Sequence, residues 1–402
     1  MSDHWRQSTW GDEISLEYGK AIRGYQDSGA SIRVFGSNGP IGWTETALAQ
    51  GPGVILGRKG AYRGVHFSRE PFYVIDTAYF VRPKTNMDMR WLYYAMIHHK
   101  LGEIDDGSPI PSTTRAAVYI QDFAVPAIHE QREIAAILGA LDDKIELNRK
   151  TAETLEAMAR ALYRSWFVDF DPVWAKAEGR APAHMDAATA ALFPDDFGQD
   201  GLPMGWELGK LGEVARSSRE GVDPQNIDPS TPYIGLEHIP RRSIALNEWG
   251  VADDVGSTKS VMRTGQFLFG KLRPYFHKVG MVPIDGICST DIIVVEAKAD
   301  QWREFVLSVI SSVDLVDHVN AASTGTRMPR AKWQDLADYG ITIAPPRVLE
   351  AFSSQLRPMH ERISALIHES NTLAALRNTL LPRLMSGELR LGEGREQLEA
   401  VA

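Results

Sequence analysis

The sequence predicts an α+β protein in which one unit, a mixed α/β globular module followed by a long helix, occurs twice. Three observations predict this. The two halves share motifs, each half ends in apolar residues spaced as a heptad, and 402 residues accommodate two to four domains. We therefore divide the chain into modules at 1–125 and 201–345 and helical segments at 126–200 and 346–402. We expect the helices to form an antiparallel coiled coil that separates the modules, with a pseudo-twofold relation between the halves.

The two modules share short motifs in the same order along the chain. A tryptophan-initiated motif opens each module, an apolar run ending in glycine and a cation lies in its middle, and a glutamine–aspartate pair precedes the helix. The matched stretches are Trp5-x4-Trp10-Gly11-Asp12 with Trp206-x4-Leu211-Gly212-Glu213, Ile55–Lys59 with Leu268–Lys271, and Gln121-Asp122-Phe123 with Gln334-Asp335-Leu336. Such self-similarity is typical of a duplicated structural unit.

The helical segments carry apolar residues at heptad positions a and d, and an offset of 218 residues places one segment on the other. An amphipathic core helix is the commoner interpretation of such a stripe, but the matched second copy favours pairing of the two helices. Asn148 at an a position would then help to fix their register. We expect the helices to end before Asp169 and near Pro382. The predicted seam comprises Leu141, Ile145, Asn148, Leu155 and Leu162 with Met359, Ile363, Leu366, Leu373 and Leu380.

The order of the segments predicts how the modules are spaced. Each module precedes its helix, so antiparallel helices would hold the modules far apart. Residues 134–166 would span roughly 50 Å at 1.5 Å per residue. This length corresponds to about 15 base pairs at roughly 3.4 Å each. The predicted shape therefore suits a target in two parts along a rod.

The net charge of −9, taken alone, argues against nucleic-acid binding. Residues 126–200 account for −6 of it, with 8 basic and 14 acidic residues. Within the modules, cations and aromatic residues collect in four windows free of acidic residues, at equivalent places in the two halves. Such side chains contact phosphates and bases, so we predict DNA contacts there. The candidates are Arg58, Lys59, Tyr62, Arg63, Thr113, Thr114 and Arg115, and then Lys271, Arg273, Tyr275, Lys278, Thr326, Arg327 and Arg330.

The sequence contains no complete motif for catalysis or metal binding. Gly265–Leu272 nearly matches a phosphate-binding loop, but Leu272 stands where a hydroxyl should bind magnesium. Cys288 is the single cysteine and lies in an apolar stretch, which favours a core position and excludes an internal disulfide or a zinc ribbon. The histidines show no metal-ligand spacing. We expect no catalysis, metal or cofactor in this chain, and a cytoplasmic location, because signal and membrane-spanning sequences are absent.

Several stretches resemble the specificity (S) subunit of type I restriction–modification systems. They are Glu130-Gln131-Arg132 after Pro126, Leu141–Arg149 with Thr154–Met158, Ser165-Trp166-Phe167-Val168-Asp169-Phe170-Asp171-Pro172, and Leu380–Leu389. The resemblance covers essentially the whole chain and is most specific in the helical regions. In the second half, Arg347–Glu350 replaces the Glu-Gln-Arg motif, which puts the start of that helix in doubt.

The resemblance implies a division of labour within a larger complex. The modules 1–125 and 201–345 would be target recognition domains that read the two halves of an asymmetric site in double-stranded DNA. The helical segments would be the family's conserved spacer helices, which set the gap and dock two modification (methyltransferase) subunits. Those subunits would carry S-adenosylmethionine, and a restriction or motor subunit, where present, would use ATP and magnesium. This chain would then be a non-catalytic part of a DNA methylation and restriction system.

Two other functions remain open at this point. The chain could be a coiled-coil protein–protein scaffold with duplicated binding modules, which the negative net charge favours. It could also be an enzyme built on Gly265–Leu272, the weakest of the three hypotheses. DNA affinity that falls steeply with salt distinguishes the reader of DNA from the scaffold.

Overall fold

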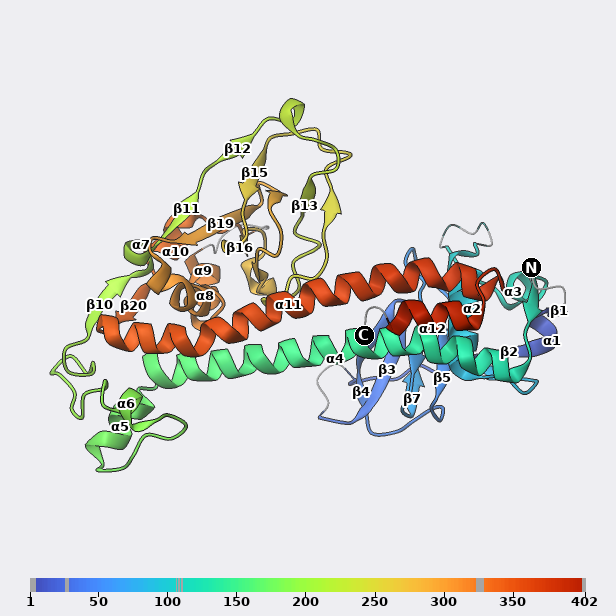
Figure 1. The fold of residues 1–402 in the computed structure, drawn as a ribbon, viewed down its shortest axis with the longest axis horizontal. Coiled ribbons are helices and arrows are strands. Elements are labelled where there is room, and N and C mark those ends of the chain that lie inside the picture. Colours follow the sequence, from blue (N-terminus) through green and yellow to red (C-terminus); the bar gives the residue numbers. More distant parts are fainter. Residues whose placement is uncertain are drawn as a thin grey trace. The chain divides into compact units, whose positions relative to one another are not determined.

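The computed structural model describes residues 5–25, 29–105, 107, 109, 111–322 and 329–399. The chain forms two compact units. Unit 1 consists of Met1–Ile145 with Thr372–Ala402, and unit 2 consists of Glu146–Asn371. Each unit thus joins one module to part of both long helices, which are α4 (Ile128–Phe167) and α11 (Pro346–Met385) (Figure 1). The N-terminal and C-terminal parts of the chain therefore belong to the same compact unit.

A four-stranded antiparallel sheet forms the centre of the module in unit 1. The strands are arranged in the order β2-β8-β5-β6, and all five residues of β5 are buried. The helix α2 (Met89–His98) packs against β5 and β6 and begins where the Asp88 carboxylate accepts hydrogen bonds from the Arg90 and Trp91 amides. The strands are β2 (Ile14–Tyr18), β5 (Gly53–Gly57), β6 (Val65–Ser68) and β8 (Ala78–Pro83).

Two smaller groups of strands complete this module. A three-stranded sheet in the order β4-β3-β7 contains one parallel pair, β3 with β7. The strand that opens the module, β1, pairs with β9 just before α4, and Trp10 is fully buried on the Phe123 ring with centroids 4.0 Å apart. The elements are β1 (Arg6–Thr9), α1 (Trp10–Glu13), β3 (Ile32–Gly36), β4 (Gly39–Thr44), β7 (Phe72–Val74), η1 (Leu101–Glu103), α3 (Arg115–Tyr119) and β9 (Asp122–Val125).

The module in unit 2 repeats this topology. Its four-stranded sheet has the order β11-β19-β16-β17, the counterpart of β2-β8-β5-β6, and β10 pairs with β20 as β1 pairs with β9. The internal repeat predicted from the motifs is confirmed. The elements are β10 (Glu207–Lys210), α7 (Leu211–Val214), β11 (Ala215–Ser218), β16 (Phe267–Gly270), β17 (Val279–Met281), β19 (Ile292–Ala297), α8 (Arg303–Ile310), α9 (Val313–Ala322), α10 (Trp333–Ala337) and β20 (Gly340–Ile343).

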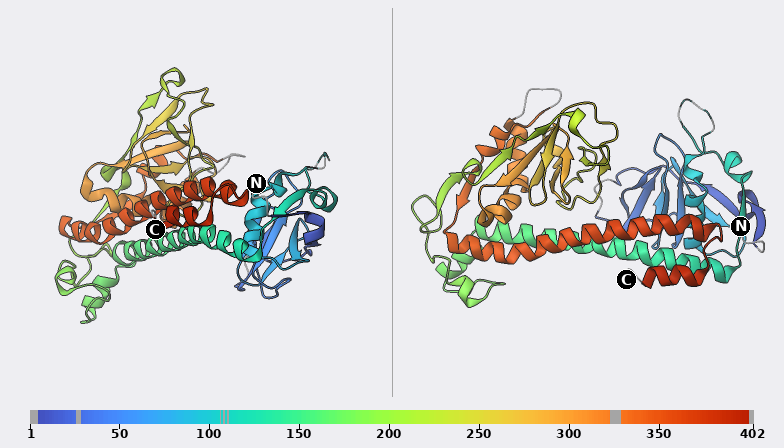
Figure 2. Two further views of the ribbon diagram at one scale, coloured as in Figure 1. Left: turned by 45° about the vertical axis from the view of Figure 1, so that its right-hand side comes forward. Right: turned by 45° about the horizontal axis from the view of Figure 1, so that its top comes forward.

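The second sheet distinguishes the two modules. It has five strands in unit 2, in the order β12-β15-β18-β13-β14, and it retains a parallel pair, β13 with β18. The strands β12 and β15 are additions. Figure 2 shows the ribbon from two further directions. The elements are β12 (Gly221–Val222), η2 (Pro224–Asn226), β13 (Pro232–Ile234), β14 (Gly250–Val251), β15 (Lys259–Met262), η3 (Pro274–Phe276), β18 (Gly286–Cys288) and η4 (Asp300–Trp302).

The long helices pack antiparallel inside each unit. In unit 1, Arg377 of α11 forms a 2.7 Å ion pair with Asp142 of α4. In unit 2, the Asn148 amide donates to Ser370 Oγ at 3.3 Å, and the Trp166 and Phe352 rings lie 5.7 Å apart. The seam positions Leu141, Asn148, Ile363, Leu366, Leu373 and Leu380 are buried, and Ile145, Leu155, Leu162 and Met359 pack partly buried against the unit cores.

The long helices α4 and α11 end in different ways. The first ends at Phe167, as expected, and two short helices follow, α5 (Asp171–Ala177) and α6 (Ala187–Ala190). The second continues past Pro382 to Met385, because the Pro382 carbonyl still accepts from the Ser386 amide, and Gly387 then adopts a left-handed φ of 69°. A final helix, α12 (Leu391–Glu399), packs Leu391 and Leu398 against the core of unit 1.

Within the described ranges, no single helix is long and apolar enough to cross a membrane. One bent pair, Asp300–Ile310 with Val313–Ala322, passes the same criteria on length and composition. Residues of this pair, such as Val306 and Leu315, belong to the buried core of unit 2.

We predict that Leu380→Ala lowers the free energy of unfolding by about 2 to 5 kcal/mol, because the fully buried side chain leaves a cavity in the seam. Chemical denaturation followed by circular dichroism measures the change. Leu147→Ala on α4 is the control, since that side chain is 57% exposed, and it should stay within about 0.5 kcal/mol. Equal losses in the two variants would contradict a packed helix seam.

Candidate nucleic-acid interface

The two acid-free windows of unit 1 lie side by side. The loop after β5 runs next to the segment that leads into α3. The Thr113 amide donates to the Arg58 carbonyl at 2.9 Å, and the Gly60 amide donates to the Pro111 carbonyl at 3.0 Å. Between these bonds, Lys59 and Ser112 form an isolated antiparallel bridge. The fold thus joins two basic windows, which are distant in sequence, into one surface.

Unit 2 builds the same loop pair with the same hydrogen bonds. The Ala331 amide donates to the Lys271 carbonyl at 2.9 Å, and the Arg273 amide donates to the Pro329 carbonyl at 2.9 Å. Leu272 and Arg330 form the corresponding bridge. Position by position, Lys271 therefore takes the place of Arg58. The repeat extends from the strands to the loops that carry the candidate residues.

The cation at this shared position is held in the same way in both units. The Arg58 guanidinium donates through Nη2 to the Asp76 carbonyl at 3.0 Å. The Lys271 ammonium donates to the Thr290 carbonyl at 2.6 Å. Each acceptor stands two residues before the next strand of the sheet, β8 or β19. Burial, and then the neighbouring Arg330, lowers the pKa of Lys271.

Some predicted contact residues serve the loops themselves. Arg63 donates to Thr113 Oγ1 at 3.1 Å, to the Gly60 carbonyl at 2.7 Å and to the Ile104 carbonyl at 3.2 Å. Thr113 is fully buried, so its hydroxyl faces the protein and not the solvent. The Thr114 hydroxyl accepts the Ala117 amide at 3.3 Å and caps α3. These residues fix the shape of the surface.

In unit 2, Lys278 has a similar internal role. Its ammonium donates to the Leu236 carbonyl, and burial lowers its pKa. Arg330 is exposed and pairs with Asp291 at 2.5 Å. Four more candidates also present their side chains to solvent, namely Lys59, Tyr62, Arg273 and Tyr275. Two further candidates, Thr326 and Arg327, lie outside the described residues.

A groove of about 500 Å³ opens beside the loop pair of unit 2. Its charged lining residues, among those that the structure describes, are all cations: Arg219, Lys271, Arg330 and Lys332. Trp333, the first residue of α10, lines it as well, and the remaining walls come from β11, β15 and the β19 region. A concave surface lined by cations suits a polyanion.

The corresponding region of unit 1 is a cluster of two tyrosines and two arginines. The Tyr18 and Tyr79 rings lie 5.1 Å apart. Arg115 stacks 4.1 Å above the Tyr18 ring, and Arg58 lies 5.2 Å from it. Burial, and then the adjacent Tyr18, raises the pKa of Tyr79 to about 12. This cluster combines cations with aromatic faces, as nucleic-acid surfaces often do.

Sequence reasoning missed Tyr18, Tyr79, Arg219 and Trp333. Arg219 stands beside Glu220, so it falls outside any acid-free window. The two tyrosines reach the site through cross-strand pairing of β2 with β8, which composition does not reveal. Arg115 and Trp333 are each the first residue of a short helix after a basic loop. This equivalence is the signal that could have identified Trp333 from the sequence.

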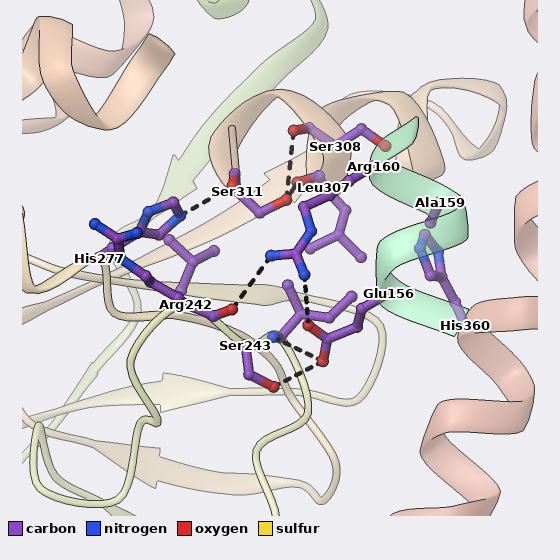
Figure 3. Close-up of a pocket in the computed structure, with 12 residues that line it drawn as sticks. Glu156, Ala159, Arg160, Arg242, Ser243, His277, Leu307, Ser308, Ser311 and His360 are labelled. Carbon is purple, nitrogen blue, oxygen red and sulfur yellow. Dashed lines mark hydrogen bonds and ion pairs between the residues drawn. The ribbon is translucent and has the colours of Figure 1, made fainter. Parts of the chain in front are cut away.

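A second pocket in unit 2 is filled by structural contacts (Figure 3). Glu156 of α4 is buried and accepts hydrogen bonds from Ser243 Oγ at 2.7 Å and from the Ile244 and Ala245 amides at 3.1 Å each. Burial raises the pKa of Glu156 above its ordinary value. The free space of about 20 Å³ admits roughly one water molecule. These contacts anchor α4 to the module of unit 2, and the pocket does not suit a ligand.

Other groups that could in principle carry chemistry, by their residue type or sequence motif, also have structural roles. Phe267–Gly270 of the near phosphate-loop match is the fully buried strand β16. Cys288 is buried, and burial raises the pKa of its thiol to about 12. Asp169 pairs with Arg164 at 2.8 Å just after α4. Within the described ranges, no group of three or more histidine, cysteine, aspartate or glutamate residues is placed to hold a metal ion.

Comparison with known proteins finds similar sequences and a similar fold. Residues 28–157 match the family model of the type I restriction modification DNA specificity domain. The MjaIX specificity subunit of Methanocaldococcus jannaschii is 25% identical over 329 residues, 77% of this chain and 71% of that protein. The HindI specificity subunit of Haemophilus influenzae is 24% identical, covering 79% and 81%. The EcoDI specificity subunit of Escherichia coli is 22% identical, covering 94% and 85%.

A solved structure shows the same fold. The S subunit of a type I restriction–modification system from M. genitalium matches with a TM-score of 0.58 at 13% identity, covering 96% of this chain and 97% of that one. The chain is thus similar in sequence to DNA specificity subunits of restriction–modification systems, and it shares the fold of one solved member. More particularly, the resemblance stated above is confirmed, and the chain is a relative of the type I specificity subunits.

We predict that Arg63→Ala lowers the free energy of unfolding by about 2 to 4 kcal/mol, because the variant loses hydrogen bonds from a charged group and leaves their acceptors unpaired. Denaturant titration measures the loss. Tyr62→Ala at the neighbouring position is the control, since that side chain is 78% exposed and should change stability by less than about 0.5 kcal/mol. If Arg63→Ala were as stable as the control, the loop-fixing role would be wrong.

Proposed function

We propose that this chain is the DNA-sequence specificity subunit of a type I restriction–modification complex. Each unit reads one half of an asymmetric, bipartite site, and the two helices set the gap between the half-sites. The observation that carries the proposal is the repeated loop pair. The same backbone hydrogen bonds present a cation at the same place, Arg58 in unit 1 and Lys271 in unit 2. A reader of two half-sites needs such a duplicated surface.

The electrostatic character of the surfaces supports DNA as the ligand. The groove of unit 2 carries Arg219, Lys271, Arg330 and Lys332, and the cluster of unit 1 carries Arg58 and Arg115. Cations of this kind position a protein on phosphates, while arginine also forks onto guanine. The acidic residues that dominate the net charge belong instead to residues 126–200. Local charge, not total charge, decides binding here.

The helices supply surfaces for partner subunits. Two apolar residues of α4, Leu147 and Met158, are exposed, and so is Trp174 of α5. We assign these surfaces to two modification subunits, which would bring S-adenosylmethionine and the methyl-transfer chemistry. A restriction or motor subunit would bring ATP and magnesium. The chain itself acts by recognition and not by catalysis, in the cytoplasm, where the cell's DNA lies.

A module exchange tests the proposal. Residues 201–345 are replaced by the corresponding module of another specificity subunit, and the chimaera is co-expressed with its modification subunits. Mapping the methylated adenines in host DNA should show one half of the motif changed and the other half retained. The unaltered chain, expressed in parallel, defines the reference motif. A motif altered in both halves, or in neither, would contradict independent reading by two modules.

A further inference from the structure

The strand registers assign equivalent positions around the loop pairs of the two units. In unit 1, Tyr18 lies opposite Tyr79 in the β2–β8 pair. In unit 2, the β11–β19 pair ends with Ser218 opposite Val294. The next residue, Arg219, is therefore equivalent to Tyr18. At the helix starts, Arg115 opens α3 and Trp333 opens α10. All the positions of unit 2 named here line the basic groove.

One position is common to both sites, and two are exchanged. Arg58 and Lys271 are both cations tied to a backbone carbonyl. At the strand end and the helix start, unit 1 has tyrosine and arginine, whereas unit 2 has arginine and tryptophan. The aromatic side chain and the guanidinium have therefore changed places. The backbone that carries them keeps the same hydrogen bonds in both units.

The exchanged arginine of unit 1 is oriented by an aromatic plane. Its guanidinium lies 4.1 Å from the centre of the Tyr18 ring and 5.8 Å from that of Tyr79. Within the described residues, the buried Nε of Arg115 has no hydrogen-bond acceptor. Stacking therefore positions the guanidinium, and the protein leaves its Nε without an acceptor. An unpartnered donor held in a fixed plane suits an acceptor supplied by a ligand.

We propose that the exchanged pair, Tyr18 with Arg115 in unit 1 and Arg219 with Trp333 in unit 2, determines which bases each unit reads. This inference rests on the proposed function. The arginine of each pair donates to the edge of a guanine in the major groove, where O6 and N7 accept two parallel hydrogen bonds. The aromatic residue holds the plane of the guanidinium or packs against a neighbouring base. Because the pair is exchanged, one scaffold presents its arginine from the helix start in unit 1 and from the strand end in unit 2.

Arginine and lysine differ in a way that makes the inference testable. A phosphate accepts from either cation, but only the planar fork of arginine matches guanine with two bonds. Replacement by lysine therefore keeps the charge and removes the base preference. At the shared position, where the cation is tied to the backbone, the chain itself has arginine in one unit and lysine in the other.

The experiment uses Arg115→Lys and Arg219→Lys in the full chain, each co-expressed with the modification subunits, followed by mapping of methylated adenines. Arg115→Lys should weaken discrimination about 5- to 150-fold at one base pair of the half-site read by unit 1, and leave the other half-site unchanged. Arg219→Lys should do the same in the half-site read by unit 2. The control is Arg33→Lys, because Arg33 stacks on Trp43 at 3.9 Å on the other sheet of unit 1, and it should keep the reference motif.

The results separate the inference from the proposed function. Absence of a bipartite motif with the unaltered chain would contradict the proposed function itself. A bipartite motif that both lysine variants reproduce without change would overturn the inference alone. So would a uniform loss of methylation by folded variants, since that indicates a phosphate or assembly role. Thermal unfolding establishes that the variants fold, and if Arg115→Lys does not, the exposed Arg219 decides the question.

Discussion

The antiparallel packing of two shared helices is the constraint on which the rest of the structure depends. Each compact unit contains part of α4 and part of α11, so neither module buries its apolar surface with its own helix alone. In unit 1 the Asp142–Arg377 ion pair joins the helices. In unit 2 Asn148 contacts Ser370, and Trp166 meets Phe352 inside the core. The chain therefore repeats one fold twice, and each long helix contributes to both units.

The loop pairs of the two units share their backbone hydrogen bonds but differ in the side chains that surround them. The loop pairs are fixed by backbone hydrogen bonds that recur in both units, together with internal groups such as Arg63 and the buried Thr113 in unit 1. The side chains displayed around them differ between the units. Because backbone bonds do not depend on side-chain identity, one fold can present different surfaces. A shared backbone with different side chains suits the proposed reading of a different half-site by each unit.

The repeated architecture could be predicted because heptad spacing and paired motifs can be read directly from the order of residues along the chain. The seam residue Asn148 and the helix end at Phe167 follow from such patterns. The basic loops could be predicted from the absence of acidic residues. The sequence did not distinguish Arg63, whose guanidinium bonds within the protein, from Lys59, which is exposed. Tyr18 and Arg219 escaped because cross-strand register places them, and register depends on contacts between distant segments.

The proposed function requires the shared helices to hold two independent readers at a set spacing. One heptad inserted after Asn148, with a matching heptad after its partner Ser370, lengthens both helices while the seam is preserved. Seven residues add roughly 10 Å, or about three base pairs. Mapping of methylated adenines should then show both half-sites unchanged and the gap longer by about three base pairs. A gap of unchanged length between intact half-sites would contradict the account.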